Sequence, residues 1–162
     1  MNEKSQRNLF NYLLKNGIKN FIGVPDSTLK YFIKEGLNKK KILISTREEE
    51  AIGIASGFTL SGHDALVFMQ NAGFANSLST ISSLVQMYNF PMIFLIGWRG
   101  YLKDDAPEHV KIGKIQPKLI QTLGIKSRIL SDSNYVKNTD WAISQLKQNR
   151  IVALIIKREF ID

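Results

Sequence analysis

The segment EEEAIGIASGFTLSGHDALVFMQNAG, residues 48–73, contains two patterns in direct succession. Residues 48–60 show the apolar spacing of a helix, whereas ALVFMQ, residues 65–70, is a short apolar run that is typical of a buried strand. A strand that is apolar on both faces belongs in a parallel sheet with helices packed on each side. This segment therefore favours an α/β fold.

The same alternation of strand and helix patterns continues through the rest of the chain. The predicted strands are residues 20–24, 42–45, 65–70, 92–97, 127–130 and 151–156, and the predicted helices are 3–15, 27–37, 48–60, 76–88, about 116–123 and 134–148. We expect a doubly wound, mainly parallel six-stranded sheet with helices on both faces, formed by residues 1–162 as a single domain. Residues 98–114 form the long irregular connection, and connections of this length are often functional.

The composition excludes several classes of site and protein. With no cysteine and two histidines in 162 residues, disulfides, thiolate metal sites and a zinc centre are not expected, and we assign no metal ligand in this chain. No apolar run reaches the roughly 18–20 residues of a membrane helix, and the polar start MNEKSQRN does not resemble a signal peptide. We expect a cytoplasmic protein without membrane contact.

The chain is basic, with a net charge of +8, and this raises nucleic acid as a partner. The basic residues are weakly clustered, however. The one real run, NKKK at residues 38–41, lies between a predicted helix and a predicted strand, where a solvated loop explains it. Nucleic acid is therefore not favoured, and a small anionic substrate suits the same charge.

Four polar segments follow predicted strands and should meet at one edge of the sheet. They are GVPDS, STREEE, MQNAG and GWRG. Ligands of open α/β sheets bind beyond the carboxyl ends of the strands. The chain contains neither G-x-G-x-x-G nor a P-loop, so it lacks the usual sequence device for binding a diphosphate by itself.

The acidic cluster at residues 48–50 has a simple local explanation and an unusual continuation. Thr46 and Glu49 have capping-box spacing, and Glu49 and Glu50 suit the positive end of a helix. Small residues then follow at i, i+4 spacing: Ala51 and Ala55, with Gly53 and Gly57. Glycine costs a helix about 1 kcal/mol relative to alanine. We therefore expect a partner helix or a subunit interface to pack closely there.

Three segments in the same order resemble the pyrimidine-binding domain of thiamine-diphosphate enzymes. They are GVPDS at residues 23–27, REEEAIGIASG at 47–57 and NAGFAN at 71–76. Within that superfamily, GVPDS, MQNAG, IGWRG and DAPEH are most similar to the phosphonopyruvate and sulfopyruvate decarboxylases, and the resemblance covers residues 5 to about 130. The family's diphosphate-binding module, with its G-D-G motif, is absent from this sequence.

The resemblance implies a separate α subunit that decarboxylates phosphonopyruvate or sulfopyruvate only together with a β subunit. The cofactor would be thiamine diphosphate with Mg²⁺, both held mainly by the β subunit's diphosphate-binding domain. The substrate would be a small anionic 2-oxo acid. Glu48 occupies the place of the glutamate that hydrogen-bonds to the aminopyrimidine and activates it. The isolated chain would be inactive and would form a homodimer.

Other residues at the predicted edge carry two interpretations each. Pro25 contacts the pyrimidine ring or only shapes a turn. Asp26 and Ser27 bind substrate or cap the helix that follows them. Gln70, Asn71 and Asn76 place amides beside the cofactor, although Asn71 also suits a turn. Gly73 is explained by tight turn geometry.

Arg99 and His109 fall in the long connection. Arg99 binds the acid group of the substrate or fixes the loop, because a guanidinium donates bidentate hydrogen bonds. His109 resembles one member of a histidine pair in related decarboxylases, where it would bind substrate and donate a proton. Here the pair is Glu108-His109, and a loop-anchoring histidine is the alternative.

Two other functions remain open on the sequence. One is a different thiamine-dependent reaction of a 2-oxo acid, such as carboligation. The other is a noncatalytic binding module with the same fold. Product analysis separates the first from decarboxylation, and cofactor binding by the assembled complex separates the second.

Overall fold

The computed structural model describes residues 1–102 and 105–158. Within these ranges, six parallel strands form one sheet in the order β2-β1-β3-β4-β6-β5. The strands are β1 (Asn20–Gly23), β2 (Ile42–Ile44), β3 (Ala65–Gln70), β4 (Met92–Trp98), β5 (Lys126–Leu130) and β6 (Ile151–Lys157). Each predicted strand is present, and the predicted doubly wound fold is confirmed.

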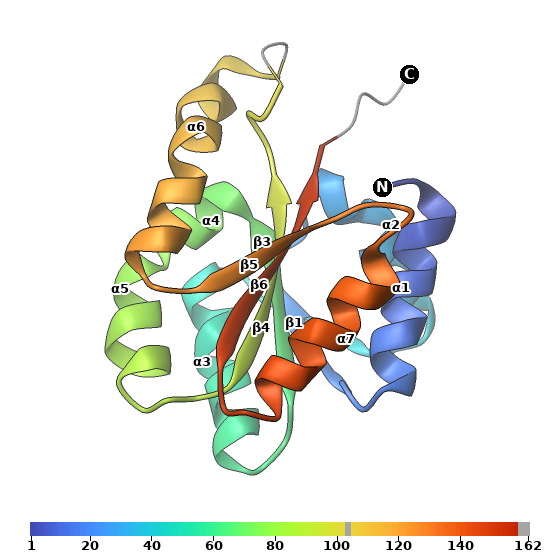
Figure 1. Ribbon diagram of the computed structural model, residues 1–162, viewed down its shortest axis with the longest axis vertical. Helices are drawn as coiled ribbons and strands as arrows, with labels where there is room; N and C mark the ends of the chain where they lie inside the picture. Colours follow the sequence, from blue (N-terminus) through green and yellow to red (C-terminus); the bar gives the residue numbers. More distant parts are fainter. Residues whose placement is uncertain (103–104, 159–162) are drawn as a thin grey trace.

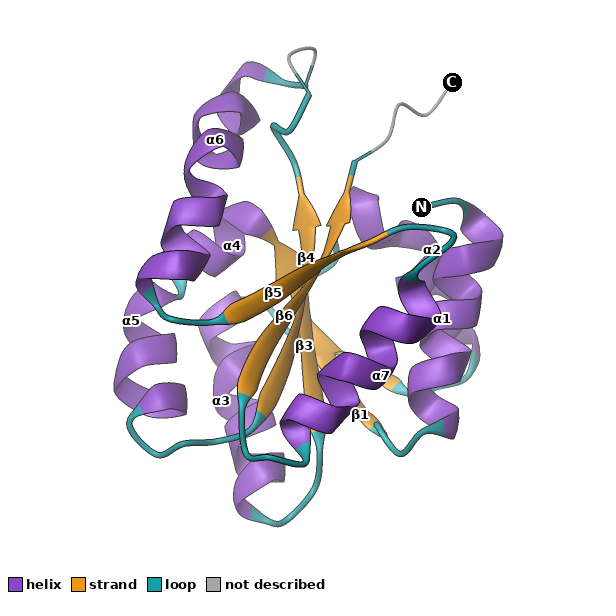
Figure 2. Cartoon of the chain, viewed as in Figure 1, coloured by secondary structure: helices purple, strands orange, loops and turns teal. Residues whose placement is uncertain are grey.

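Helices cover both faces of this sheet (Figure 1, Figure 2). One face carries α1 (Glu3–Lys15), α2 (Lys30–Asn38) and α7 (Tyr135–Leu146), and a 3₁₀ turn, η1 (Ser27–Leu29), leads into α2. The other face carries α3 (Glu48–Leu60), α4 (Asn71–Asn76), α5 (Leu78–Thr80), the π-helical η2 (Ile81–Gln86) and α6 (Pro107–Thr122). The layered arrangement buries the sheet between two sets of helices.

The two hydrophobic cores follow from the alternation of side chains along each strand. In β1, Phe21 packs into the core beneath α1 and α2, while Ile22 packs into the core beneath α3. Phe10 and Phe32 surround Phe21, with ring centroids 4.5 and 6.0 Å away. Because β3 and β4 are apolar on both faces, they lie in the middle of the sheet.

The prediction of one helix over residues 76–88 is wrong. Helix α4 begins at Asn71, directly after β3, and three short helical pieces replace the single helix. The buried Ser77 hydroxyl donates a hydrogen bond to the carbonyl of Gly73 at 2.8 Å. Such back-bonding bends a helix, and the chain continues through a π-helical turn, which periodicity in the sequence does not reveal.

The prediction of an irregular connection over 98–114 is also wrong for its second half. Helix α6 begins at Pro107, so the connection covers residues 99–106, of which 103–104 lie outside the described part of the chain. Proline is well suited to the first position of a helix, and Glu108 interacts favourably with the helix dipole. Pro117 lies inside α6, and we find no physical reason for its presence there.

The described residues contain neither a membrane-spanning helix nor a cluster of metal-ligating side chains. In ranges 1–102 and 105–158, no helix has both the length and the apolar character that a membrane span requires. The same residues contain no group of three or more acidic or histidine side chains arranged to hold a metal ion.

Candidate active site

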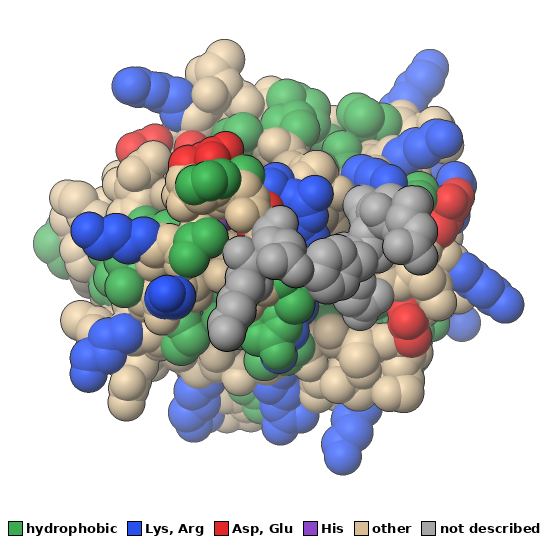
Figure 3. Space-filling view, turned by 90° about the horizontal axis from the view of Figure 1, so that it is seen from above, with side chains coloured by type: hydrophobic (Ala, Val, Ile, Leu, Met, Phe, Trp, Pro, Cys, Tyr) green, Lys and Arg blue, Asp and Glu red, His purple; other side chains and the backbone are tan. Residues whose placement is uncertain are grey.

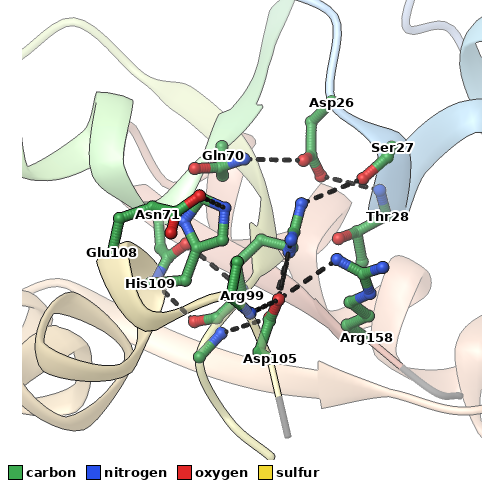
Figure 4. Close-up of polar contacts among 12 residues, drawn as sticks. Asp26, Ser27, Thr28, Gln70, Asn71, Arg99, Asp105, Glu108, His109 and Arg158 are labelled. Carbon is green, nitrogen blue, oxygen red and sulfur yellow. Dashed lines mark hydrogen bonds and ion pairs between the residues drawn. The ribbon is translucent and has the colours of Figure 1, made fainter.

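The carboxyl ends of the strands gather the predicted residues at one edge of the sheet. Because all strands are parallel, the residues that follow β1, β3 and β4 meet there (Figure 4). Asp26, Gln70 and Arg99 come from these three ends. The end of β6 adds Arg158, which we did not predict as a site residue.

Glu48 is the first residue of α3, and its side chain is half-buried. It reaches across to α4, where a Cβ placed on Gly73 would coincide with the Glu48 carboxyl group. Gly73 therefore provides the space in which this side chain lies. Among residues 1–102 and 105–158, the Glu48 carboxylate has no hydrogen-bond or ion-pair partner. Because the side chain is only half-buried, this carboxylate can still accept a hydrogen bond from a group outside the chain.

The neighbouring glutamates lie in the first turn of α3. Thr46 pairs with Glu50, however, and not with Glu49 as predicted. The N-cap is Arg47, and the Glu50 carboxylate accepts hydrogen bonds from the Thr46 backbone N–H at 2.9 Å and its hydroxyl at 2.8 Å. The Thr46 bonds lower the pKa of Glu50. The capping box predicted for Thr46 and Glu49 is wrong, because α3 begins one residue later than that pairing requires.

Asp26 is buried and its carboxylate is fixed from two sides. It accepts a hydrogen bond from the backbone N–H of Thr28 at 3.1 Å and one from the Gln70 amide at 3.1 Å. A Cβ at Gly97 would collide with the same carboxylate. Asp26 is the N-cap of η1, so the predicted capping role is confirmed for this residue, and Gln70 is held toward Asp26.

Asn71 connects the ends of β3 and β4. Its side-chain amide donates to the carbonyl of Arg99 at 2.9 Å and accepts from the Arg99 backbone N–H at 3.2 Å. The residue is fully buried at the start of α4. This paired bond fixes the backbone from which the Arg99 side chain projects.

The Arg99 side chain is held by Asp105. Its Nε and Nη2 atoms donate to the Asp105 carboxylate at distances of 2.7 to 3.2 Å, and Nη1 donates to the Ser27 hydroxyl at 3.2 Å. Arg158 donates to the same carboxylate at 3.2 Å. The backbone N–H groups of Gly100 and Ala106 complete its partners.

This environment stabilises the ionised form of Asp105. The Arg99 guanidinium holds the pKa of the Asp105 carboxyl far below its usual range, and the backbone N–H groups of Gly100 and Ala106 act in the same direction. The side chain is 4% exposed, so little water competes for these bonds. The described residues on either side of 103–104 thus contact a carboxylate that is ionised at neutral pH.

His109 lies in the first turn of α6, and its side chain is 16% exposed. Its Nε2 is 3.9 Å from the Glu108 carboxylate. The backbone at His109 packs against Gly100, where a Cβ would collide with the His109 carbonyl oxygen. Gly100 has a φ of +71°, so both its conformation and its contacts require glycine.

Pro25 and Asn76 are exposed. Pro25 is the second residue after β1, at the edge where the other residues meet. Asn76 is the last residue of α4, so it lies at the far end of this helix from Asn71. The contacts found among described residues bring Asp26, Gln70 and Arg99 together and do not include Pro25 or Asn76.

Two site residues escaped prediction, Asp105 and Arg158. The signal for Arg158 was present, because Lys157 and Arg158 directly follow the last strand pattern, residues 151–156, and all carboxyl ends share one edge. Asp105 gave no comparable signal, since its partners are set by how the loop after β4 folds back.

Comparisons with known proteins agree with this geometry. Residues 4–121 match the family described as thiamine pyrophosphate enzyme, N-terminal TPP binding domain. Over 119 residues the chain is 34% identical to sulfopyruvate decarboxylase subunit alpha of Methanococcus maripaludis, covering 72% of this chain and 71% of that protein. It is 27% identical over 129 residues to phosphonopyruvate decarboxylase of Streptomyces viridochromogenes, covering 78% of this chain and 32% of that protein.

A solved structure shows the same fold in a more distant protein. The 2-oxoglutarate:ferredoxin oxidoreductase from Magnetococcus marinus superimposes with a TM-score of 0.73 at 12% identity, over 94% of this chain and 28% of that chain. The family match spans most of the sequence and includes the residues described at the ends of β1, β3 and β4, although Arg158 lies outside it. The chain therefore belongs to the thiamine pyrophosphate enzymes, in the family of the sulfopyruvate and phosphonopyruvate decarboxylases.

Proposed function

We propose that this chain is the α subunit of a thiamine-diphosphate-dependent decarboxylase that acts on sulfopyruvate or phosphonopyruvate. The observation that carries the proposal is the half-buried carboxylate of Glu48, which lies in the space left by Gly73 and has no partner among the described residues. A β subunit with the diphosphate-binding domain would complete the site. The relatives named subunit alpha support a partner of this kind.

The residues present fit the pyrimidine end of the cofactor. A carboxylate without a partner accepts a hydrogen bond from a protonated ring nitrogen, and Glu48 is the one acid at the start of α3 whose side chain is turned toward α4. Glu50 is already bonded to Thr46. Pro25 is exposed after β1, and in this proposal it contacts the flat face of the pyrimidine ring. In this proposal the diphosphate and Mg²⁺ are held mainly by the partner.

The bound cofactor would supply the electron sink that decarboxylation of a 2-oxo acid requires and that protein side chains do not provide. The task of Glu48 is to hold a proton at its carboxyl oxygen, in a hydrogen bond to the aminopyrimidine. The absence of a side chain at Gly73 leaves room for the carboxyl group at this point.

Ser27, Arg99 and His109 are proposed to face the substrate. Arg99 brings its Nη1 to the Ser27 hydroxyl, so a carboxylate of the substrate that reaches Ser27 also meets a guanidinium. His109 is proposed as the proton donor for product release. Gln70 donates a hydrogen bond to the buried Asp26 carboxylate and so links the ends of β3 and β1 beneath these residues. Asn71 acts on the site through the Arg99 backbone.

The partner is proposed to cover the exposed glycines of α3. A Cβ placed on Gly53 or Gly57 would meet nothing within 4 Å among the described residues, so packing within that part of the chain does not require glycine there. The two glycines border an open apolar groove of about 370 Å³ that includes Leu60 and Tyr88. Close approach of a second subunit explains both the small residues and the exposed apolar side chains. The homodimer and the cytoplasmic location remain predictions.

The deciding experiment combines the chain with a candidate β subunit, thiamine diphosphate and Mg²⁺. Decarboxylation of sulfopyruvate, phosphonopyruvate and pyruvate is measured for the complex and for each subunit alone, with product analysis to detect carboligation. We expect activity in the complex alone. Absence of decarboxylation by a verified, cofactor-loaded complex would overturn the proposed reaction. If the assembled α–β complex does not bind thiamine diphosphate, the noncatalytic module is favoured.

A further inference from the structure

A basic cavity lies next to the Arg99–Asp105 pair at the carboxyl edge of the sheet. Its volume is about 290 Å³, and it lies between the start of α1, η1, the start of α2 and the end of β6. Its walls include the cations Lys30, Lys157 and Arg158 together with the hydroxyl-bearing Ser27 and Thr28. Figure 3 looks down onto this edge and shows Lys and Arg side chains around it.

The positive charge of this cavity is not balanced by its own acids. Lys30 lies 4.6 Å from the centre of the Tyr31 ring and Lys157 lies 4.0 Å from the centre of the Tyr101 ring, and neither has an ion pair with a described acid. Glu3 also lines the cavity, but its carboxylate is paired with Arg7 at 2.6 Å. A cavity with surplus cations attracts an anion.

The two guanidinium groups that contact Asp105 differ in what they have left to donate. Arg99 uses Nε, Nη1 and Nη2 on Asp105 and Ser27, and its side chain is 12% exposed. Arg158 contributes Nη1 alone, at 3.2 Å, and its side chain is 35% exposed. Within the described residues, the Nε and Nη2 atoms of Arg158 have no acceptor. Arg158 therefore retains the paired donors that bind a tetrahedral oxyanion.

We propose that this cavity binds the terminal sulfonate or phosphonate group of the substrate, with Arg158 as the specificity-determining residue. Lys30 and Lys157 add charge, and Ser27 is shared between the cavity and the Arg99 side chain. This inference deepens the proposed function and rests on it for the identity of the ligand. It assigns the anion to Arg158 rather than to Arg99, which the sequence had favoured.

Asp105 is the positioning residue of this site. Five donors converge on its carboxylate: Nε and Nη2 of Arg99, Nη1 of Arg158, and the N–H groups of Gly100 and Ala106. An incoming anion does not displace a carboxylate with this many partners. Asp105 therefore stays in place and fixes Arg158 at the cavity wall, while the rest of that guanidinium faces the ligand.

The kinetic test compares substrates with and without the terminal acid group in the α–β complex. In Arg158→Gln, we expect the KM for sulfopyruvate or phosphonopyruvate to rise about tenfold or more, with kcat nearly unchanged. The KM for 2-oxobutanoate, which lacks the acid group, stays the same. Arg158→Lys keeps the positive charge but not the planar guanidinium group. Its KM for the same substrate should therefore lie between that of the wild type and that of Arg158→Gln. Lys19→Gln, at the opposite end of the sheet, is the matched control.

A binding test on the full α chain alone does not depend on turnover. Isothermal titration calorimetry with phosphonoacetate gives a Kd that we expect to weaken about tenfold or more in Arg158→Gln and not in Lys19→Gln. Thermal melting of each variant checks folding, and Arg158→Lys serves if Arg158→Gln unfolds. Propionate, without the second acid group, should bind far more weakly.

The outcomes separate this inference from the proposed reaction. An inactive complex whose α chain binds phosphonoacetate through Arg158 would reject the decarboxylation and retain the anion site. An active complex in which Arg158→Gln leaves both the KM and the Kd unchanged would reject the anion site and retain the reaction. Absence of phosphonoacetate binding to the wild-type chain also overturns the inference. So does a result in which inorganic sulfate binds as tightly as phosphonoacetate and Arg158→Gln does not change the KM.

Discussion

The carboxyl group of Glu48 lies in the space that a side chain at Gly73 would occupy. The two residues belong to different helices, α3 and α4, and come from two of the segments that resemble thiamine-diphosphate enzymes. Gly73 was expected to serve a tight turn, but it lies inside α4 and its φ is not positive. Glycine at this position is explained by the position of Glu48 and not by backbone conformation.

Gly73→Ala should therefore displace Glu48 without unfolding the chain. The new methyl group and the carboxyl group cannot share one place, and a flexible side chain gives way more easily than a helix. We expect thiamine diphosphate binding by the α–β complex to weaken about tenfold or more, measured by calorimetry. Gly53→Ala is a stability control in the isolated α chain only, because its new methyl group meets nothing within 4 Å among the described residues and the free energy of unfolding should rise by up to about 1 kcal/mol. Unchanged cofactor affinity in Gly73→Ala would contradict this account.

Glu48→Gln should abolish turnover by the assembled complex while leaving the fold intact. An amide occupies nearly the same volume but cannot hold and exchange the proton, so the loss should reach at least about 100-fold in kcat. The matched control is Glu49→Gln in the same helical turn, for which we expect near-normal activity. Circular dichroism and thermal melting check that both variants fold. Near-normal turnover in Glu48→Gln would remove Glu48 from its proposed role.

The sequence was sufficient for the sheet because short apolar strands leave a strong local signal. All six predicted strands are present within a residue or two of their expected ends, and parallel order follows from the alternation with helices. Helix boundaries were less predictable where tertiary contacts decide them. Ser77 back-bonding divides the helix expected at 76–88, and α6 extends to Pro107, where the sequence pattern had indicated a loop.

The site was predictable to the level of the edge and not to the level of individual bonds. The parallel order of the strands places Asp26, Gln70 and Arg99 at the same edge, independently of the contacts that their side chains make. Which acceptor Arg99 binds depends on where Asp105 lies, and Gly100, on the other side of residues 103–104, is held by its contact with α6. Sequence periodicity contains no information on such a contact.

Replacing Gly53 and Gly57 with leucine should prevent assembly with the β subunit. Both positions are open in this chain, so the double variant should remain folded, with a melting temperature close to that of the wild type. Two large side chains on the face proposed for the partner would block close approach. Size-exclusion chromatography of the mixed subunits measures complex formation, and Gln121→Leu on α6 is the control for added hydrophobicity. A normal complex would show that the partner does not cover this face.

Asp105→Asn should destabilise the chain and change its response to acid. The carboxylate is a shared acceptor for Arg99 and Arg158, and an amide leaves part of this charge unpaired, at a cost of about 3 kcal/mol at pH 7. The free energy of unfolding in urea measures this loss. The control is Asp132→Asn at an exposed site, where we expect a change within about 0.5 kcal/mol.

The pH dependence separates the charge of Asp105 from its packing. The pKa of Asp105 is lowered in the folded chain, mainly by Arg99, and is about 3.9 in an unfolded chain. Between these values the unfolded state binds more protons, so this contribution is complete above about pH 4 and is lost as the pH falls toward the folded pKa. The wild type should therefore lose more unfolding free energy than Asp105→Asn between about pH 4 and pH 2.5. If the unfolding free energies of the two proteins fell in parallel over this pH range, the pair with Arg99 would not be what keeps Asp105 ionised.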